Sequence, residues 1–255
     1  MMRTTHAFSA FALVTVVVSS TAPSAHADET YIVGVENIEY YPQYNFKDGE
    51  YSGFARVLLD DFAHENHYVF TYSAYPVARL FNEFMDGTVD LKYPDNALWS
   101  SELTKGHNVV YSDPVVNYTD GVSILPDHKG RPVSELKQLG IVRGFTAWEY
   151  ADQIKNGTIK LQENNSFVGL LEVTQLGRVD GAYGNVAVVN YTLKNNLKKP
   201  DALIYNPSLP HTTDAYHLSS IKHPKVIAEF NAWLKQNADK VAKLKADYAV
   251  EAGVP

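Results

Sequence analysis

The 255-residue sequence contains no cysteine. Disulfide bonds, thiol nucleophiles and cysteine-ligated zinc or iron–sulfur sites are therefore excluded, because each of them needs a thiol or thiolate. Basic residues are also outnumbered, since 22 Lys and Arg stand against 29 Asp and Glu and leave a net charge of -7. No nucleic-acid partner is expected, because neutralising phosphates needs clustered basic side chains, and none are clustered here.

The sequence also lacks the common signatures of hydrolytic, zinc and nucleotide chemistry. It has no Gly-x-Ser-x-Gly turn, no His-Glu-x-x-His motif and no glycine-rich loop that ends in Lys-Ser or Lys-Thr. His64 and His67 are interpreted as surface histidines, because His67 falls at a helix end. We therefore predict a protein without enzyme activity, metal site or cofactor.

Residues 1–27 have the layout of a secretory signal peptide. Arg3 gives a positive start, Ala7–Ala22 is uncharged and mostly apolar, and Ala25-His26-Ala27 supplies the small residues of a cleavage site. A membrane span is the alternative, but a span needs about 20 predominantly apolar residues and this run is diluted by Ser and Thr. We expect cleavage between Ala27 and Asp28 and a soluble protein in the periplasm.

Strand and helix patterns alternate after the signal peptide. Thr30–Val35 is typical of a buried strand, Glu36–Glu50 is expected to be a loop, and Gly53–His64 has the apolar spacing of a helix. A turn-rich segment at Pro126–Pro132 precedes a second series of strands and helices, and one long helix is expected over Pro224–Val250. The alternation predicts parallel β-α units and an α/β fold.

Two such series indicate two lobes, each with a mostly parallel sheet flanked by helices. Chain crossings are expected near Asp120-Gly121 and near Pro210–Thr213. The first lobe would then comprise residues 28–120 and 213–255, and the second lobe residues 121–212. Ligands of open α/β sheets bind beyond the carboxyl ends of the strands, so the expected binding site is a cleft between the lobes.

Two local patterns favour ligand binding in that cleft. Tyr40, Tyr41 and Tyr44 crowd the segment after the first strand, where an aromatic ring can stack on a flat or cationic ligand. Gly144-Phe145-Thr146 precedes a helix, and free backbone N–H groups at such a turn can hold an anion. The alternatives are an exposed turn for the tyrosines and a simple helix cap for Thr146.

Four short motifs follow one another in a characteristic order, namely Tyr41-Pro42 with Gly53-Phe54, Gly87-Thr88-Val89-Asp90, Tyr111-Ser112-Asp113-Pro114 and Gly177-Arg178-Val179-Asp180-Gly181. This order resembles family 3 of the extracytoplasmic solute-binding proteins, the periplasmic receptors of polar amino-acid uptake systems. The resemblance covers essentially the whole chain after residue 27. It implies a two-lobed type II periplasmic-binding-protein fold, a monomer, a small polar solute as ligand, and the membrane permease of an ABC importer as partner.

The resemblance also implies ligand contacts, and the sequence departs from the family at two of them. Tyr41 or Tyr44 takes the place of the aromatic residue that stacks on the ligand. Lys105 stands nearest to the arginine that clamps the ligand carboxylate, and Asn185 stands where an aspartate meets the ligand ammonium. Lysine lacks the bidentate geometry of arginine, and the amide removes an ion pair, which Asp95 could replace.

The predicted ligand-binding residues are Tyr40, Tyr41, Tyr44, Asp95, Asn96, Lys105, Arg143, Phe145, Thr146, Tyr183 and Asn185, with Arg79, Trp99 and Trp148 as further candidates. For Arg79 and Trp148 the alternatives are a solvated helix charge and core packing behind the turn. Besides the importer receptor, two functions remain open. One is a sensor that presents its closed form to a membrane receptor. The other is a lyase or dehydratase in which Glu36, Glu39, Asp95 and Lys105 could supply acid–base groups.

Overall fold

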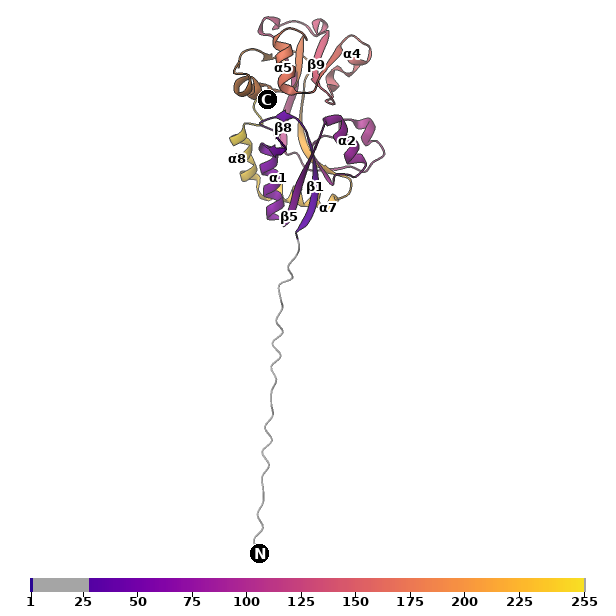
Figure 1. The fold of residues 1–255 in the computed structure, drawn as a ribbon, viewed down its shortest axis with the longest axis vertical. Helices are drawn as coiled ribbons and strands as arrows, with labels where there is room; N and C mark the ends of the chain where they lie inside the picture. The colour runs from indigo at the N-terminus through magenta and orange to yellow at the C-terminus, as the bar shows by residue number, and fades with distance from the viewer. Residues whose placement is uncertain (2–27, 255) are drawn as a thin grey trace.

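A computed structural model describes Met1 and residues 28–254. Apart from Met1, the predicted signal peptide lies outside these residues. The described chain forms two lobes, with the first lobe carrying the labels β1, β5, α1, α2, α7 and α8 in Figure 1, and the second lobe carrying β9, α4 and α5. In the part of the chain that is described, no helix combines the length and the apolar character needed to cross a membrane.

The first lobe is built around β1, whose inward side chains include the fully buried Val33 and Val35. This strand pairs in parallel with two others, and the sheet continues through antiparallel pairs. Its strands are β1 (Glu29–Glu36), β5 (Tyr68–Tyr75), β6 (Leu91–Asp95), β7 (Val110–Tyr111) and β13 (Thr212–Ser220). Its helices are α1 (Phe54–Glu65), α2 (Val77–Met85), α3 (Ser101–Thr104), α7 (Pro224–Gln236) and α8 (Ala238–Tyr248).

The second lobe repeats this plan around β9, which pairs in parallel with the strands on both sides. Its strands are β8 (Val116–Ile124), β9 (Gln138–Val142), β10 (Lys160–Asn164), β11 (Gly181–Asn185) and β12 (Ile204–Tyr205). Its α-helices are α4 (Ala151–Lys155), α5 (Phe167–Gln175) and α6 (Val186–Tyr191). Short helical turns complete the lobe at η1 (Pro126–His128), η2 (Val133–Glu135), η3 (Trp148–Tyr150) and η4 (Thr192–Asn196).

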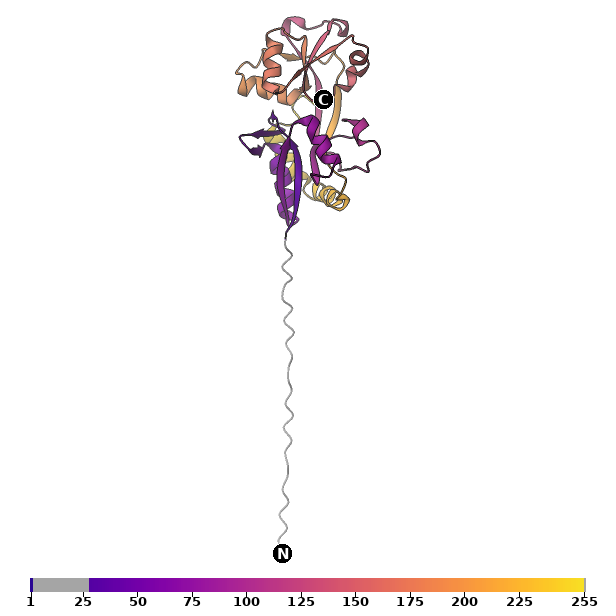
Figure 2. The same ribbon diagram turned by 45° about the vertical axis from the view of Figure 1, so that its right-hand side comes forward.

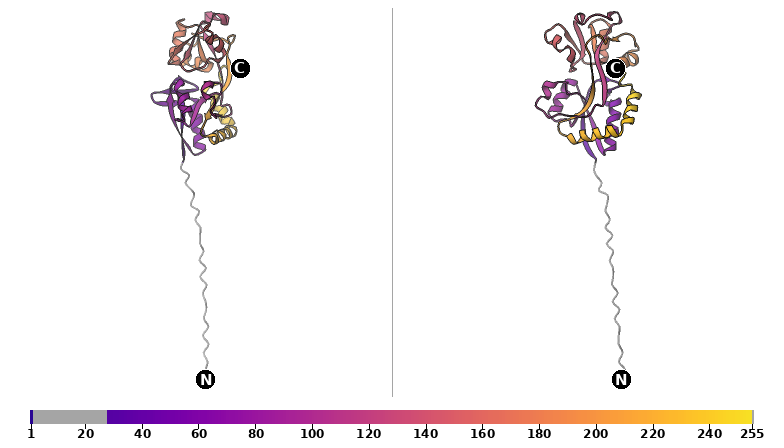
Figure 3. Two further views of the ribbon diagram at one scale, coloured as in Figure 1. Left: turned by 90° about the vertical axis from the view of Figure 1, so that its right-hand side faces the viewer. Right: turned by 180° about the vertical axis from the view of Figure 1, so that it is seen from behind.

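Two long antiparallel strands, β8 and β13, connect the lobes. They pair with each other from Thr212 opposite Asp120 to Tyr216 opposite Val116. β13 then continues into the sheet of the first lobe beside β6, whereas β8 continues into the sheet of the second lobe beside β11. One hydrogen-bonded ribbon therefore runs between the lobes, and the view from behind in Figure 3 shows it.

The segment expected to be a loop after the first strand contains a small sheet instead. β2 (Glu39–Tyr40), β3 (Tyr44–Lys47) and β4 (Glu50–Ser52) pair as an antiparallel meander, which projects beside α1 in Figure 2. The loop interpretation was wrong because the strands have only two to four residues each, and the pairing buries Tyr40, Tyr44 and Tyr51.

The expected long terminal helix is divided into α7 and α8 at Asn237. This residue leaves helical geometry, with φ -107° and ψ 25°. Its side-chain amide donates to the carbonyl oxygen of Trp233 at 3.2 Å, and the indole N–H of Trp233 donates to Glu65 of α1 at 2.7 Å. An amide that bonds to nearby backbone competes with the helical pattern, and apolar spacing alone does not reveal such a break.

The lobes are in direct contact. The Tyr40 ring of the first lobe lies edge-on against Phe145 and Phe167 of the second lobe, with ring centroids 5.5 and 4.8 Å apart. Gly144 has φ 95°, and a Cβ atom built on it would lie 2.7 Å from the backbone nitrogen of Ala78 in α2. The structure therefore describes a closed arrangement in which the turn after β9 meets the first lobe closely.

Candidate functional site

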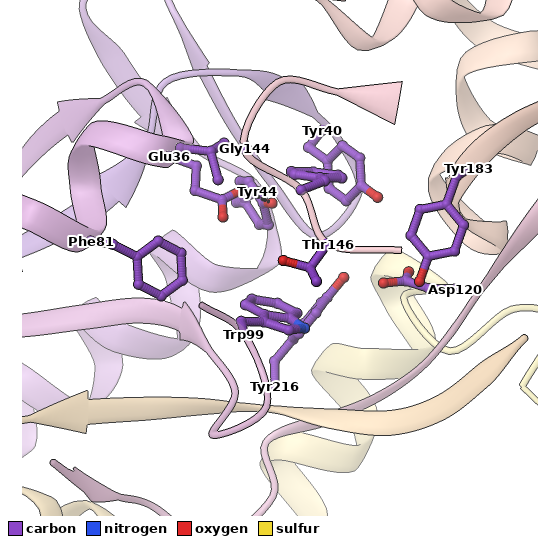
Figure 4. Close-up of a pocket in the computed structure, with 12 residues that line it drawn as sticks. Glu36, Tyr40, Tyr44, Phe81, Trp99, Asp120, Gly144, Thr146, Tyr183 and Tyr216 are labelled. Atoms are coloured by element: carbon purple, nitrogen blue, oxygen red, sulfur yellow. Dashed lines mark hydrogen bonds between the residues drawn. The ribbon is translucent and has the colours of Figure 1, made fainter. Parts of the chain in front are cut away.

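A pocket lies between the lobes, and the ribbon forms part of its wall. Its empty volume is about 410 Å³, which includes space open to solvent. Figure 4 shows side chains from both lobes facing this space. The lining comprises Glu36, Tyr40, Tyr44, Val77, Phe81, Trp99, Asp120, Gly144, Phe145, Thr146, Tyr183 and Tyr216.

Aromatic side chains make up seven of the twelve lining residues. Tyr40 and Tyr44 lie next to each other with ring centroids 5.3 Å apart, and Trp99 lies edge-on to Tyr216 at 5.7 Å. Since aromatic faces carry partial negative charge, such walls favour apolar or cationic groups over anions.

Glu36 brings a carboxylate to the pocket from the carboxyl end of β1. Its side chain is only 2% exposed, and the Tyr44 hydroxyl donates a hydrogen bond to it. Burial raises the pKa of Glu36 to about 7, against the smaller lowering effects of the Tyr44 hydrogen bond and the charge of Lys92. The group is thus partly protonated at neutral pH when no cation stands beside it.

Asp120 brings a second carboxylate from the connecting strand β8. No hydrogen bond to its side chain is present among the described residues, and its Oδ1 atom is buried without a partner. Burial raises the pKa of Asp120 to about 8, and the negative charges of Glu149 and Glu36 add to the effect. A buried carboxylate in this condition lacks the cation or donors that normally stabilise its charge.

Glu149 lies behind Tyr183 and extends the acidic region. The Tyr183 hydroxyl donates to its Oε2 at 3.1 Å, while its Oε1 is buried without a partner. Burial raises the pKa of Glu149 as well. Two carboxyl groups with raised pKa values thus line the pocket, from β1 and β8, and a third lies behind Tyr183 in η3.

Within residues 28–254, no Lys, Arg or His side chain lines the pocket to balance these acids. Lys92 is the cation that influences Glu36, and it is fully buried behind the wall, with its Nζ atom 4.0 Å from the ring centre of Phe81. It is already paired, because Nζ donates to Asp95 at 2.8 Å and to the carbonyl oxygen of Pro94 at 2.9 Å. Its charge is therefore neutralised by Asp95 and not by the acids of the pocket.

The structure brings six of the residues named from the sequence to the pocket: Tyr40, Tyr44, Trp99, Phe145, Thr146 and Tyr183. Asn185 lies directly behind two of the lining rings. Its backbone N–H donates to the Tyr40 hydroxyl at 2.9 Å and its side-chain amide donates to the Tyr216 hydroxyl at 3.1 Å. Its Oδ1 atom accepts from the first backbone N–H groups of α6, so its role in the closed form is to hold these elements in place.

The remaining candidates are placed elsewhere. Tyr41 packs on Tyr191, with ring centroids 4.5 Å apart, on a face outside the pocket lining. Asp95 receives Lys92 and also the Ser219 hydroxyl at 2.5 Å, so it is a satisfied structural group. Asn96 donates to Asp214 at 2.9 Å and to a backbone carbonyl, and it lies outside the lining.

The cationic candidates from the sequence all lie in solvent. Lys105 is exposed after α3, Arg143 pairs with Glu163 at 3.0 Å with 60% of its side chain exposed, and Arg79 pairs with Glu83 at 2.9 Å. Trp148 is partly buried in η3 and does not line the pocket. The chain thus places no arginine or lysine where the resemblance implies a clamp for a ligand carboxylate.

Sequence reasoning missed five lining residues that matter for charge and shape, namely Glu36 as a ligand contact, Val77, Phe81, Asp120 and Tyr216. A signal existed for two of them. Glu36 ends the first buried strand, where ligands of such sheets bind, and Asp120 is the one charged residue of β8, at the expected crossing. Among the described residues, no group of three or more His, Asp or Glu side chains is arranged to hold a metal ion.

The sequence matches no protein-family model, and no curated protein is similar to it. Solved structures do match it in fold. A histidine kinase sensor domain with similarity to periplasmic binding proteins has a TM-score of 0.72 and 16% identity, over 87% of this chain and 96% of that chain. A variant of the arginine-binding protein from T. maritima has a TM-score of 0.70 and 18% identity, over 87% and 96%.

The substrate-binding protein of an amino acid ABC transporter also matches, with a TM-score of 0.68 and 19% identity, over 86% of this chain and 98% of that chain. These matches cover nearly the whole described chain and nearly the whole of each solved structure. They confirm the predicted two-lobed α/β architecture. The fold of this protein is that of the periplasmic binding proteins.

Proposed function

We propose that this protein is a periplasmic solute-binding protein that captures a small polar organic solute between its lobes and delivers it to an ABC-type importer. The observation that carries the proposal is the pocket, because one space is lined by both lobes and by the ribbon that connects them. Structurally similar proteins with this architecture include the substrate-binding protein of an amino acid ABC transporter.

The proposed mechanism is closure of the lobes over the solute. Residues 28–120 with 213–255 would form one lobe and residues 121–212 the other, and the β8–β13 ribbon would bend between them. Closure removes water from the pocket, which strengthens each polar contact made there. The closed lobes then present one composite surface to a membrane permease, and an exported monomer cleaved near Ala27 would meet that permease in the periplasm.

Small-angle X-ray scattering combined with a thermal-shift screen tests this proposal. A solute that binds should raise the melting temperature and reduce the radius of gyration relative to the unliganded protein, if the unliganded lobes open in solution. A solute at 100 times its dissociation constant stabilises the folded state by about 2.7 kcal/mol. If no solute from amino acids, amines, sugars and carboxylates changes either quantity, solute capture is refuted.

A sensory role is the second candidate, because a histidine kinase sensor domain has the same fold. Both roles need a closed form, so they differ only in the membrane partner that recognises it. Uptake of the radiolabelled solute by cells with and without this protein separates them. Loss of uptake supports the importer role, whereas unchanged uptake with lost transcriptional response supports the sensor. Mass spectrometry of the recovered solute checks that it is returned unaltered.

A further inference from the structure

We propose that the solute is an organic cation without a carboxylate, an amine or a quaternary ammonium compound, held between Glu36, Asp120 and the aromatic walls of the pocket. This inference rests on the proposed function, since it concerns the same pocket. It departs from the amino-acid ligands that the resemblance implies. Four observations support it.

The first observation is the unpaired carboxylate of Asp120. Its Oδ1 atom is buried without a partner, and no hydrogen bond reaches its side chain from the described residues. An ionised carboxylate is costly in such surroundings unless a cation or several donors stand beside it. An organic cation in the pocket supplies that missing partner.

The second observation is the position of the two carboxylates on different walls. Glu36 ends β1 in the first lobe, and Asp120 lies on the connecting strand β8 beside Tyr183 of the second lobe. In Figure 4 they stand on opposite sides of the group formed by Thr146, Trp99 and Tyr216. A cation between them would be attracted by both carboxylates in their ionised forms.

The third observation is the aromatic lining. Tyr40, Tyr44, Trp99 and Tyr216 face the same space as the carboxylates. A cation over an aromatic face gains about 0.5–2 kcal/mol, with the larger value when water is excluded. The rings also exclude water from the alkyl groups of an amine, so one lining serves both the charge and the apolar part of the ligand.

The fourth observation is the lack of any cationic side chain on the lining. Its side-chain donors are neutral, namely tyrosine hydroxyls, the Thr146 hydroxyl and the Trp99 indole. Lys92 is paired with Asp95 behind the wall, and Arg143 and Arg79 are paired in solvent. A ligand carboxylate would therefore find no cation on the lining, and it would be repelled by Glu36 and Asp120 wherever these are ionised, which selects against amino acids.

Matched pairs of compounds test the inference. The probes are agmatine against arginine, cadaverine against lysine, and choline against glycine betaine, each pair differing chiefly in the carboxylate. Isothermal titration calorimetry at neutral pH should show binding of at least one amine or quaternary ammonium member, and at least tenfold weaker binding of its carboxylate-bearing partner. Equal or tighter binding of the carboxylate member, or no binding of all three cations, would overturn the inference.

Charge-neutral variants locate the contact. Asp120→Asn keeps the side-chain shape and should weaken binding of the cation at least tenfold, whereas Asp127→Asn should leave it unchanged, because Asp127 is exposed in η1 and lies outside the pocket lining. Since Asp120→Asn removes an unpaired buried acid, the variant should remain folded, which its melting curve checks. Unchanged affinity in Asp120→Asn would remove this residue from the site.

The pH profile of choline binding gives an independent readout, because the charge of choline does not change with pH. The affinity should rise as pH increases through about 7 and about 8, where Glu36 and Asp120 ionise. Glu149, His211 and the Lys92–Asp95 pair are the other charged or titratable groups near these two acids.

Failure of this inference is distinguishable from failure of the proposed function. If an amino acid closes the lobes instead, the inference fails while solute capture stands. If no solute closes them, the proposed function itself fails.

Discussion

Asp95 is buried and Asp120 is partly buried, and the fold treats these two aspartates in opposite ways. Asp95 receives Lys92 at 2.8 Å, Ser219 at 2.5 Å and the backbone N–H of Asn96 at 2.9 Å. The side chain of Asp120 receives no hydrogen bond from the described part of the chain, and one of its oxygens is buried without a partner. The chain itself supplies all the partners of Asp95, which therefore stabilises the structure. Asp120 lacks such partners and lies on a pocket wall, as expected of a group that binds a ligand.

The largest predicted effect comes from removing the buried ion pair between Lys92 and Asp95. Lys92→Met should lower the free energy of unfolding by about 3–5 kcal/mol, because it leaves the Asp95 charge buried without its cation. Urea denaturation measures the change. Lys105→Met, at an exposed lysine, should stay within about 0.5 kcal/mol of the parent protein. A loss below 1 kcal/mol in Lys92→Met would mean that Asp95 and Asp120 do not differ as described.

The unpaired carboxyl group of Asp120, in contrast, should lower the unfolding free energy of the unliganded protein as it ionises. Folding raises the pKa of Asp120 from 3.8 to about 8 and that of Glu36 from 4.5 to about 7, so the folded protein binds more protons than the unfolded chain in between. Unfolding free energy should therefore fall as pH rises from about 4 to about 8.

Asp120→Asn should flatten that slope and gain about 1–3 kcal/mol at the alkaline end, because it removes the unpaired charge. Denaturant titrations at several pH values measure both effects, with Asp127→Asn as the control. A slope that is unchanged in the Asp120 variant would show that this carboxyl group does not carry the pH dependence.

Gly144→Ala should separate closure from folding. Alanine at φ 95° is strained by about 1–2 kcal/mol, and its Cβ would meet the backbone nitrogen of Ala78 at 2.7 Å across the cleft. We expect a larger radius of gyration and weaker solute binding. Gly157→Ala is the matched control, because Gly157 has φ 76° and no atom within 4 Å of the added Cβ. Equal scattering profiles for the two variants would refute the close approach.

The smallest effect is expected at the exposed pair of Arg143 and Glu163. Glu163→Gln should change the free energy of unfolding by at most about 1 kcal/mol, since solvent screens a pair whose side chains are 60% and 47% exposed. Solute affinity should not change. A marked loss of affinity would place Arg143 in the site after all, and would restore the cationic contact that the sequence suggested.

The sequence predicted the fold because its strand and helix patterns recur along the whole chain. It also named Tyr40, Tyr44, Phe145 and Thr146, since aromatic crowding and a glycine turn after a strand are local signals. It misplaced the charges, because pairing depends on contacts between distant segments. Asp95 was predicted to contact the ligand, but Lys92 and Ser219 of β13 bind to it. Arg143 was predicted to lie in the cleft, but Glu163 of the neighbouring strand pairs with it in solvent.

Tyr216 and Asp120 were not identified as pocket residues from the sequence, for a related reason. Both lie on the connecting strands, whose two faces point toward different surroundings in each lobe. Which side chain faces the pocket depends on the register between β8 and β13, with Tyr216 opposite Val116 and Thr212 opposite Asp120. That register joins segments that lie far apart in the chain, so local sequence patterns did not reveal it.

The β8–β13 ribbon also restricts how the molecule can open. Two strands joined by a ladder of hydrogen bonds bend together more easily than they slide past each other. The lobes should therefore open and close by a hinge motion about this ribbon. Asp120 lies on the ribbon itself. Neutralising its charge would thus act at the hinge, where a small change in local geometry produces a large displacement at the outer edges of the lobes.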